Sequence, residues 1–320
     1  MKFLEKRYNL LEYCDVYTSN TDRTNRMKII TDLPTDTYTI TATESPSYPS
    51  GSGIFSVKLL VDLQSMDLGS LSPELNTYFT TNQYKANAVM VTGNYVDKMG
   101  NADLDGVFTL IKTANSVTGG PFTNPSTQSW DGSLDGTITN ISSAGTTTNK
   151  HSVKENVSLS LFDTLDNTDR YVEIEVCFQD NSKTGETELE VHLSNIWLGV
   201  STDLDTNGID QKTFIYTTID NSKTSTNKAG QRFSTEYNKQ KKMVGTVNTI
   251  DATEFELLKD LFDNAGTTTP VGVILDEDEN MTITDSLAKF SGLFYINKDF
   301  QFKMIAPDFY SLGFDVSQVM

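Results

Sequence analysis

The sequence has few of the residues on which most catalytic and cofactor sites depend. Its 320 residues include only two histidines, His151 and His192. A Ser-His-Asp or Cys-His site needs a histidine base held by an orienting group, and no recognisable motif surrounds either histidine. The sequence also has no Walker loop, no dinucleotide fingerprint and no Cys-x-x-Cys pair. We therefore expect no enzyme, no catalytic residues and no cofactor.

Cysteine is equally scarce, with Cys14 and Cys177 far apart in the sequence. Nothing in their spacing resembles the disulfide framework of a small secreted domain. A bridge between the two stays open as an alternative, but the pattern favours two free, buried thiols.

Long apolar runs are missing as well. The first residues, MKFLEKRYNLLEYCD, contain no continuous apolar segment of the kind that a signal peptide needs. No run of about 18 or more apolar residues predicts a membrane-spanning helix. We therefore expect a protein that is made and first folded in a cytoplasm and is not inserted into a membrane.

Positive charge is in short supply. The chain has 25 Lys and Arg residues against 43 Asp and Glu residues, which gives a net charge of -18. A negative field of this size repels phosphate backbones, so we expect no nucleic-acid partner. The closest approach to a basic patch is Arg232 with Lys239, Lys241 and Lys242. Such a short basic group is more often a solvated face or a contact with a protein partner.

Two acidic stretches have some character of cation-binding loops. Residues 203–208, Asp-Leu-Asp-Thr-Asn-Gly, resemble the start of a calcium loop, but Phe214 stands where the twelfth loop position needs a carboxylate. The run at 276–280, Asp-Glu-Asp-Glu-Asn, should splay into solvent because adjacent carboxylates repel. We interpret both as solvated turns and expect no metal site. A glycosidase-type carboxylate pair stays open on counting alone, since it depends on spatial separation.

Thr, Ser, Asn and Asp are abundant, and this mixture favours strands and turns over helices. A length of 320 residues predicts two domains at about 150 residues per domain. Apolar and polar residues alternate at 171–178 and 189–193, with Glu173 and Glu175 on the face away from the core. We therefore predict a mainly β fold with an N-terminal antiparallel jelly-roll or β-sandwich over residues 1–200.

Within that domain, residues 112–150 form a polar insertion, composed mostly of Ser, Thr, Asn, Gly and Pro. The segment fits either a long loop or a strand-bearing insertion. Its large apolar anchors are Phe122 and Trp130. So polar a stretch has little apolar surface to offset its ordering entropy. We therefore predict a contact arm that becomes ordered only against a neighbouring protein.

Residues 201–320 are predicted to form a smaller β-rich domain with one α-helix at about 251–265. Asp251 can cap this helix, Glu254 completes a capping box, and Gly266 ends the helix. Its apolar face comprises Phe255, Leu258, Leu261 and Phe262. In the strand that follows at 300–305, the residues expected to face inward are Phe300, Phe302 and Met304.

Several short motifs follow one another in an order that resembles a known family. In the front half they are Asn9-Leu10-Leu11, Leu60-Val61-Asp62-Leu63, Val89 to Asn94, Tyr171 to Ile174 and Ile196-Trp197-Leu198-Gly199. In the back half they are Gly230 to Phe233, Lys241 to Val244, Asp251 to Glu254 and Pro270-Val271. This order resembles minor structural proteins of tailed bacteriophages, which have a discoidin-like jelly-roll front half and a smaller back half.

The resemblance implies a non-enzymatic structural component of a bacteriophage virion, placed in the tail or the head-tail region. Its partners would be its own copies, in a homo-oligomer, and other virion tail or connector proteins. It would be made in the host bacterial cytoplasm and released by lysis. The alternative is a carbohydrate-binding module or adhesin that recognises host-surface glycans, with Trp130 as the side chain that stacks on a sugar. Fold alone does not decide between these functions.

Overall fold

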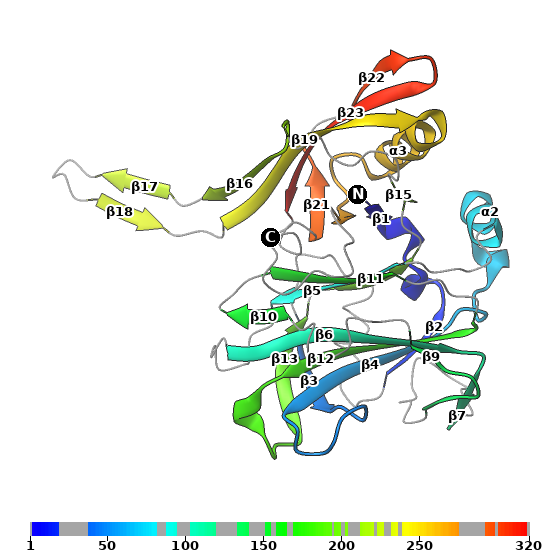
Figure 1. Cartoon of the computed structure of the whole chain (residues 1–320), viewed down its shortest axis with the longest axis vertical. Coiled ribbons are helices and arrows are strands. Elements are labelled where there is room, and N and C mark those ends of the chain that lie inside the picture. Colours follow the sequence, from blue (N-terminus) through cyan, green and yellow to red (C-terminus); the bar gives the residue numbers. More distant parts are fainter. Residues whose placement is uncertain are drawn as a thin grey trace. The chain divides into compact units, whose positions relative to one another are not determined.

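A computed structural model of the chain describes residues 2–18, 38–81, 88–94, 103–119, 133–140, 151–154, 158–164, 169–193, 195–199, 202–203, 212–220, 223–226, 232–235, 239–274, 292–297 and 300–318. The fold is mainly β, as predicted, and every pairing between described strands is antiparallel. Figure 1 shows the order of the elements along the chain.

The chain divides into two compact units. One, called here the sandwich unit, consists mostly of Arg7–Ser201; the other, the helix unit, consists of Met1–Lys6, Thr202–Leu275 and Gly292–Met320. Strand β1 (Lys2–Glu5) thus belongs with the second half of the chain, whereas the sequence grouped residues 1–200 together. The reason is pairing, because β1 lies between two strands of the helix unit and bonds to both.

The sandwich unit is built from two main sheets and also contains a separate two-stranded sheet, described below. The larger has the strand order β10-β6-β12-β4-β3-β13, with β2 beside β4 and β9 beside β6, and the smaller has the order β11-β5-β14. In the order of the described strands, the chain passes between the two sheets five times, which fits the predicted sandwich. The crossings lie between β4 and β5, β5 and β6, β10 and β11, β11 and β12, and β13 and β14. The larger sheet consists of β2 (Asp15–Thr18), β3 (Tyr38–Glu44), β4 (Ile54–Asp62), β6 (Asp103–Ala114), β9 (Thr139–Asn140), β10 (His151–Lys154), β12 (Tyr171–Gln179) and β13 (Glu188–Leu193). The smaller sheet consists of β5 (Ala88–Asn94), β11 (Ser158–Thr164) and β14 (Asn195–Gly199).

The core of this unit lies between the two sheets. Side chains of the larger sheet and Ile196 and Leu198 of the smaller sheet belong to one buried apolar cluster. The alternation predicted at 171–178 is confirmed, because the inward positions of β12 are Val172, Ile174, Val176 and Phe178. Burying this much apolar surface is the main stabilising contribution to such a unit.

Short helical elements flank the strands of the sandwich unit. The 3-10 turns are η1 (Lys6–Tyr8), η2 (Leu10–Glu12), η3 (Leu68–Ser70) and η5 (Asn181–Lys183). One α-helix, α2 (Pro73–Thr81), was not predicted from the sequence. The Ser72 hydroxyl accepts a hydrogen bond from the Leu75 amide at 3.3 Å, and Phe79 is buried against the rings of Tyr8 and Tyr13.

Described parts of the polar insertion pair within their own unit. Strand β7 (Ser116–Thr118) pairs with β8 (Ser133–Asp135), and β9 pairs with β6. Leu134 is buried among Tyr17, Leu60 and Tyr171. The prediction of an arm ordered only by a neighbour is therefore wrong for these parts, which find their burial within the unit. The two predicted anchors, Phe122 and Trp130, lie outside the described residues.

The helix unit is built on one sheet, with the order β15-β1-β20-β21-β23-β19-β16 and with β22 beside β23. Its further strands are β15 (Thr202–Asp203), β16 (Ile215–Asp220), β19 (Lys239–Asp251), β20 (Val271–Ile274), β21 (Gly292–Ile296), β22 (Gln301–Ala306) and β23 (Phe309–Gln318). A separate hairpin is formed by β17 (Lys223–Thr226) and β18 (Arg232–Thr235).

Helix α3 (Ala252–Ala265) is the helix that the sequence predicted. The Asp251 carboxylate accepts from the Glu254 amide at 2.8 Å, and the Glu254 carboxylate accepts from the Asp251 amide at 2.8 Å, which completes the capping box. The C-terminal cap is Gly266, with φ of 56°. Within the described residues, no helix is long and apolar enough to cross a membrane.

The apolar face of α3 packs on the sheet in a layer of rings. Leu258 and Leu261 are fully buried, whereas Phe255 and Phe262 are half-buried at the edge of this layer. The Phe255 ring stacks on Tyr310 with a centroid distance of 4.4 Å. The prediction that Met304 faces inward is wrong, because its side chain is 62% exposed.

Candidate functional site

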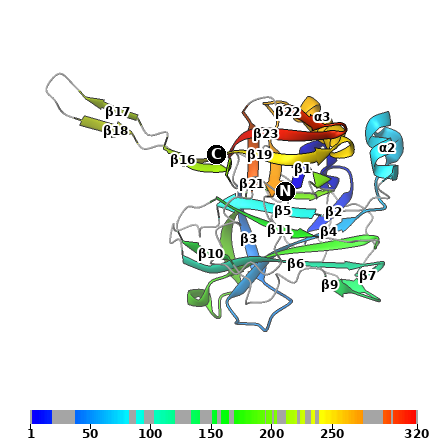
Figure 2. The same ribbon diagram turned by 45° about the horizontal axis from the view of Figure 1, so that its top comes forward.

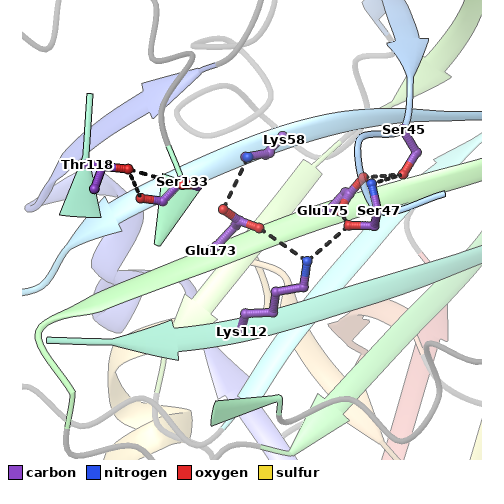
Figure 3. Close-up of polar contacts among 8 residues, drawn as sticks. All are labelled: Ser45, Ser47, Lys58, Lys112, Thr118, Ser133, Glu173 and Glu175. Carbon is purple, nitrogen blue, oxygen red and sulfur yellow. Dashed lines mark hydrogen bonds and ion pairs between the residues drawn. The ribbon is translucent and has the colours of Figure 1, made fainter. Parts of the chain in front are cut away.

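A row of charged and polar side chains crosses the outer face of the larger sheet. The sequence placed Glu173 and Glu175 on the face of β12 away from the core, where a solvent-exposed position is expected. Both carboxylates are nevertheless buried, with residue exposures of 4% for Glu173 and 0% for Glu175. β12 is an interior strand between β4 and β6, so neighbouring side chains surround them on both sides. Figure 3 shows the row.

Glu173 joins two lysines from the flanking strands. Its Oε2 lies 3.2 Å from the Lys58 Nζ on β4, and its Oε1 lies 3.7 Å from the Lys112 Nζ on β6. Glu173 lies directly opposite Lys112 in the register of β12 and β6. One buried carboxylate is thus shared by two ammonium groups, which offsets the cost of removing its charge from water.

Glu175 is held by hydroxyl groups from the loop that follows β3. Ser45 Oγ donates to one carboxylate oxygen at 2.6 Å, and Ser47 Oγ donates to the other at 2.7 Å. Lys112 Nζ donates to the same Ser47 hydroxyl at 2.9 Å. The row is therefore one continuous network that runs from Lys58 through Glu173, Lys112 and Ser47 to Glu175 (Figure 3).

Apolar clusters close both ends of this network. One contains Tyr17, Leu60, Ala114, Leu134 and Tyr171, and the other contains Ile54, Phe108 and Cys177 with Tyr48 and Leu110 beside them. The β7–β8 hairpin adds a contact of its own at this face, where the hydroxyls of Thr118 and Ser133 lie 3.1 Å apart (Figure 3).

A glycosidase needs two carboxyls that face a substrate across a cleft, whereas Glu173 and Glu175 are enclosed by protein groups. We therefore interpret the row as a structural network.

A second polar cluster ties the start of β12 to the end of β4. Arg170 donates two hydrogen bonds to the Asp62 carboxylate, from Nε at 2.8 Å and from Nη2 at 2.6 Å. The guanidinium also lies 4.8 Å from the centroid of the Tyr171 ring. The neighbouring Asp169 accepts from the Thr113 hydroxyl at 2.6 Å. This bidentate pair fixes the strand ends and is already satisfied within the protein.

Two motifs of the family resemblance, far apart in sequence, meet in the sandwich unit. The Asn9 Oδ1 accepts from the amide of Leu11 at 3.3 Å and from the amide of Leu198 at 3.0 Å. Beside them, a Cβ on Gly199 would lie 2.9 Å from the carbonyl oxygen of Tyr8, so this close approach requires glycine. The Asn-Leu-Leu turn is thereby locked onto β14.

The histidines are not brought together. His151 is on β10 and His192 on β13, at opposite ends of the larger sheet. Of the two acidic stretches that were predicted to be solvated turns, Asp203 lies in β15, whereas residues 204–208 and 276–280 lie outside the described residues. Among the residues that the structure describes, no group of three or more His, Cys, Asp or Glu side chains is arranged to hold a metal ion.

Both cysteines are free thiols, as the sequence favoured; Cys177 is fully buried and Cys14 is half-buried. Burial, with a smaller effect of the charges of Asp62 and Asp15, raises the pKa of Cys14 from about 9 to about 12. Burial also raises the pKa of Cys177 well above its ordinary value. A thiol attacks as its thiolate, so both groups are poor nucleophiles at neutral pH.

We predict that both thiols of the folded protein react slowly with an aromatic disulfide reagent at pH 8. A pKa of about 12 in place of about 9 lowers the thiolate fraction of Cys14 roughly 1,000-fold. In native buffer the reagent should therefore release its aromatic thiolate far more slowly than in denaturant. In denaturant both cysteines should react within the mixing time of a manual assay. Fast reaction of one equivalent in native buffer would contradict the burial of that thiol.

Apolar side chains gather at the end of the β22–β23 hairpin. Met304, Ile305 and Phe309 are 62%, 49% and 46% exposed, and they flank the turn at Asp308, whose φ is 62°. We call these three residues the hairpin patch. Among the described strands, β22 pairs only with β23, so the outer edge of β22 is open. Sequence alternation pointed Met304 inward and therefore missed this surface.

The sequence matches no known protein-family model and no curated protein.

Proposed function

We propose that the chain is a non-enzymatic structural component of a bacteriophage virion, in the tail or the head-tail region. It works by assembling with its own copies and with neighbouring virion proteins. The observation that carries this proposal is the hairpin patch. Single exposed apolar residues are ordinary on a protein surface, but adjacent ones on an open strand edge are typical of a surface that a protein partner covers.

The composition of the patch favours a protein partner. Phe309 pairs with Ala306 across the hairpin, and Met304 pairs with Tyr310, so the exposed residues belong to one short piece of ribbon. Aromatic residues and methionine are enriched at protein interfaces. The Tyr310 ring, on the residue that pairs with Met304, is fixed by stacking on Phe255 of α3. The patch therefore rests on a rigid base, which reduces the entropy lost when a partner binds.

The order of the motifs supports the phage assignment. The front-half motifs that resemble minor virion proteins include Asn9-Leu10-Leu11 and Ile196 to Gly199, which are joined through the Asn9 side chain. The motif at Leu60 to Leu63 lies on or beside β4, next to Asp15 and Val16 of β2. These contacts give the motifs a shared physical role in one sandwich, as expected if the family's front half is a stable frame that presents contact surfaces.

The proposal is tested in particles that have the variant chain as their only source of this protein. The variant carries Met304→Ser, Ile305→Ser and Phe309→Ser. We expect it to fold, since all three side chains are exposed, and its content per purified particle to fall at least about tenfold as an apolar interface is lost. Quantitative mass spectrometry of the particles measures this content.

The matched control removes exposed apolar side chains that lie in neither proposed contact surface, through Ile138→Ser and Leu257→Ser. This control should be incorporated at the normal level. Normal incorporation of the patch variant would show that the patch is not the contact. Absence of the wild-type chain from purified particles would contradict the virion assignment itself.

A further inference from the structure

A ribbon of the helix unit, two-stranded except where β19 also pairs with β23, has the opposite charge to the rest of the chain. It comprises β16, β17, β18 and residues 239–244 of β19. Its described strands contain five basic residues and one acidic residue, Asp220, which gives a net charge of +4 in a chain whose net charge is -18. The basic residues are Lys223, Arg232, Lys239, Lys241 and Lys242. All other residues together therefore have a net charge of -22.

The outer part of this ribbon lies away from the sheet of its own unit. β17 and β18 pair with each other in a separate two-stranded sheet, and Figures 1 and 2 both show them at the end of the ribbon farthest from β23. Lys242, nearer the sheet, is ion-paired to Asp315 with an Nζ–Oδ2 distance of 2.9 Å. A two-stranded hairpin is marginally stable by itself in water and gains stability when it packs on another surface.

We infer that the basic ribbon docks on the acidic surface of a second copy of this chain. The inference rests on the proposed function, and it names both the partner and the chemistry of one contact. Every copy has both a basic ribbon and an acidic remainder, so two copies are complementary to each other without any third component. Such a contact can be made reciprocally about a twofold axis, in which each ribbon reaches the other copy.

Charge decides for a second copy over nucleic acid. The ribbon alone would attract a phosphate backbone, but the net charge of -18 opposes the approach of any polyanion to the whole chain. A second copy has the same negative net charge, but it also brings a basic ribbon of its own, so two oppositely charged contacts can form at once, whereas nucleic acid offers no positive group to the acidic remainder. Complementary fields of this kind mainly increase the association rate and fix the mutual orientation of the partners.

The test is sedimentation of the full chain at 50 mM and at 500 mM salt, over a range of protein concentrations. The test variant is Lys223→Glu with Arg232→Glu, which leaves the Lys242–Asp315 ion pair in place. The matched control is Lys183→Glu with Lys259→Glu, which makes the same change in net charge on η5 and α3. We expect the wild type and the control to self-associate, and the test variant to associate at least about tenfold more weakly. We also expect high salt to weaken wild-type association.

Three results would overturn the inference. One is a wild-type chain that stays monomeric at low salt, and another is an oligomer whose affinity the ribbon variant does not change. The third is binding of a 20-base-pair DNA duplex that the ribbon variant abolishes, without self-association, because the ribbon would then be a nucleic-acid contact. The hairpin-patch variant separates this inference from the proposed function. If the patch variant is no longer incorporated into particles while the ribbon variant still is, the virion proposal stands and the ribbon inference fails.

Discussion

Replacing Glu173 by glutamine is expected to destabilise the sandwich unit by about 3–5 kcal/mol at neutral pH. The Glu173 carboxylate is buried and lies between two ammonium groups, those of Lys58 and Lys112. Glutamine keeps the shape of the side chain but removes its charge, so two partly buried cations then face a neutral group and repel each other. Breaking a buried ion pair costs more than the pair contributes, because the remaining charges stay desolvated.

Urea unfolding followed by tyrosine and tryptophan fluorescence measures this loss. The matched control is Glu188→Gln, since Glu188 is an exposed glutamate at the start of β13, and its substitution should change the free energy of unfolding by less than about 0.5 kcal/mol. A triple variant, Lys58→Met with Glu173→Leu and Lys112→Met, removes all three charges and should recover most of the lost stability. A loss below about 1 kcal/mol in Glu173→Gln would mean that the network is hydrated.

The same two glutamates show what periodicity can and cannot predict. The alternation at 171–178 correctly separated the core face of β12 from its outer face, because that separation depends only on the geometry of one strand. It did not predict that the outer face is also covered. That cover comes from Ser45 and Ser47, which are about 130 residues away in sequence, and from the β7–β8 hairpin. Pairing between distant segments leaves no local periodic signal.

Local signals were present for one element that the sequence analysis missed. Helix α2 begins at Pro73, directly after Ser72, whose hydroxyl accepts from the Leu75 amide, and its first turn contains Glu74. Serine as the cap, proline at the first helical position and an acidic residue in the first turn are all start signals. The helix is only nine residues long, too short for a strong apolar stripe. Its start was therefore more informative than its periodicity.

The alternation of apolar and polar residues along the strand failed to predict the hairpin patch for a different reason. Phe300, just before β22, and Phe302 within it contact Phe262 and Phe255 of α3. Met304 is the next residue in the same alternation, yet it is 62% exposed, so the cover that α3 gives Phe302 does not continue to it. How far a covering helix reaches along a strand is a property of the packed unit. The strand pattern alone could not locate that limit.

Leu258→Ala is expected to destabilise the helix unit by about 3–4 kcal/mol. The sequence placed both Phe262 and Leu258 on the apolar face of α3, but Phe262 is half-buried, whereas Leu258 is fully buried. Removing a fully buried leucine loses its transfer free energy and leaves a cavity that the ring layer around Phe255 cannot easily fill, since those rings already pack on one another.

The adjacent Leu257 provides the control for this prediction, because it has the same residue type on the same helix but is 48% exposed. Leu257→Ala should cost less than about 0.5 kcal/mol, since alanine has the higher helix propensity and little apolar burial is lost. Loss of helical circular dichroism in urea, compared between the two variants, measures the difference. Equal losses would mean that α3 does not pack by the face that contains Leu258 and Leu261. A loss confined to Leu258→Ala would place the anchor of the helix one turn before Phe262, where burial, rather than residue size, determines the cost.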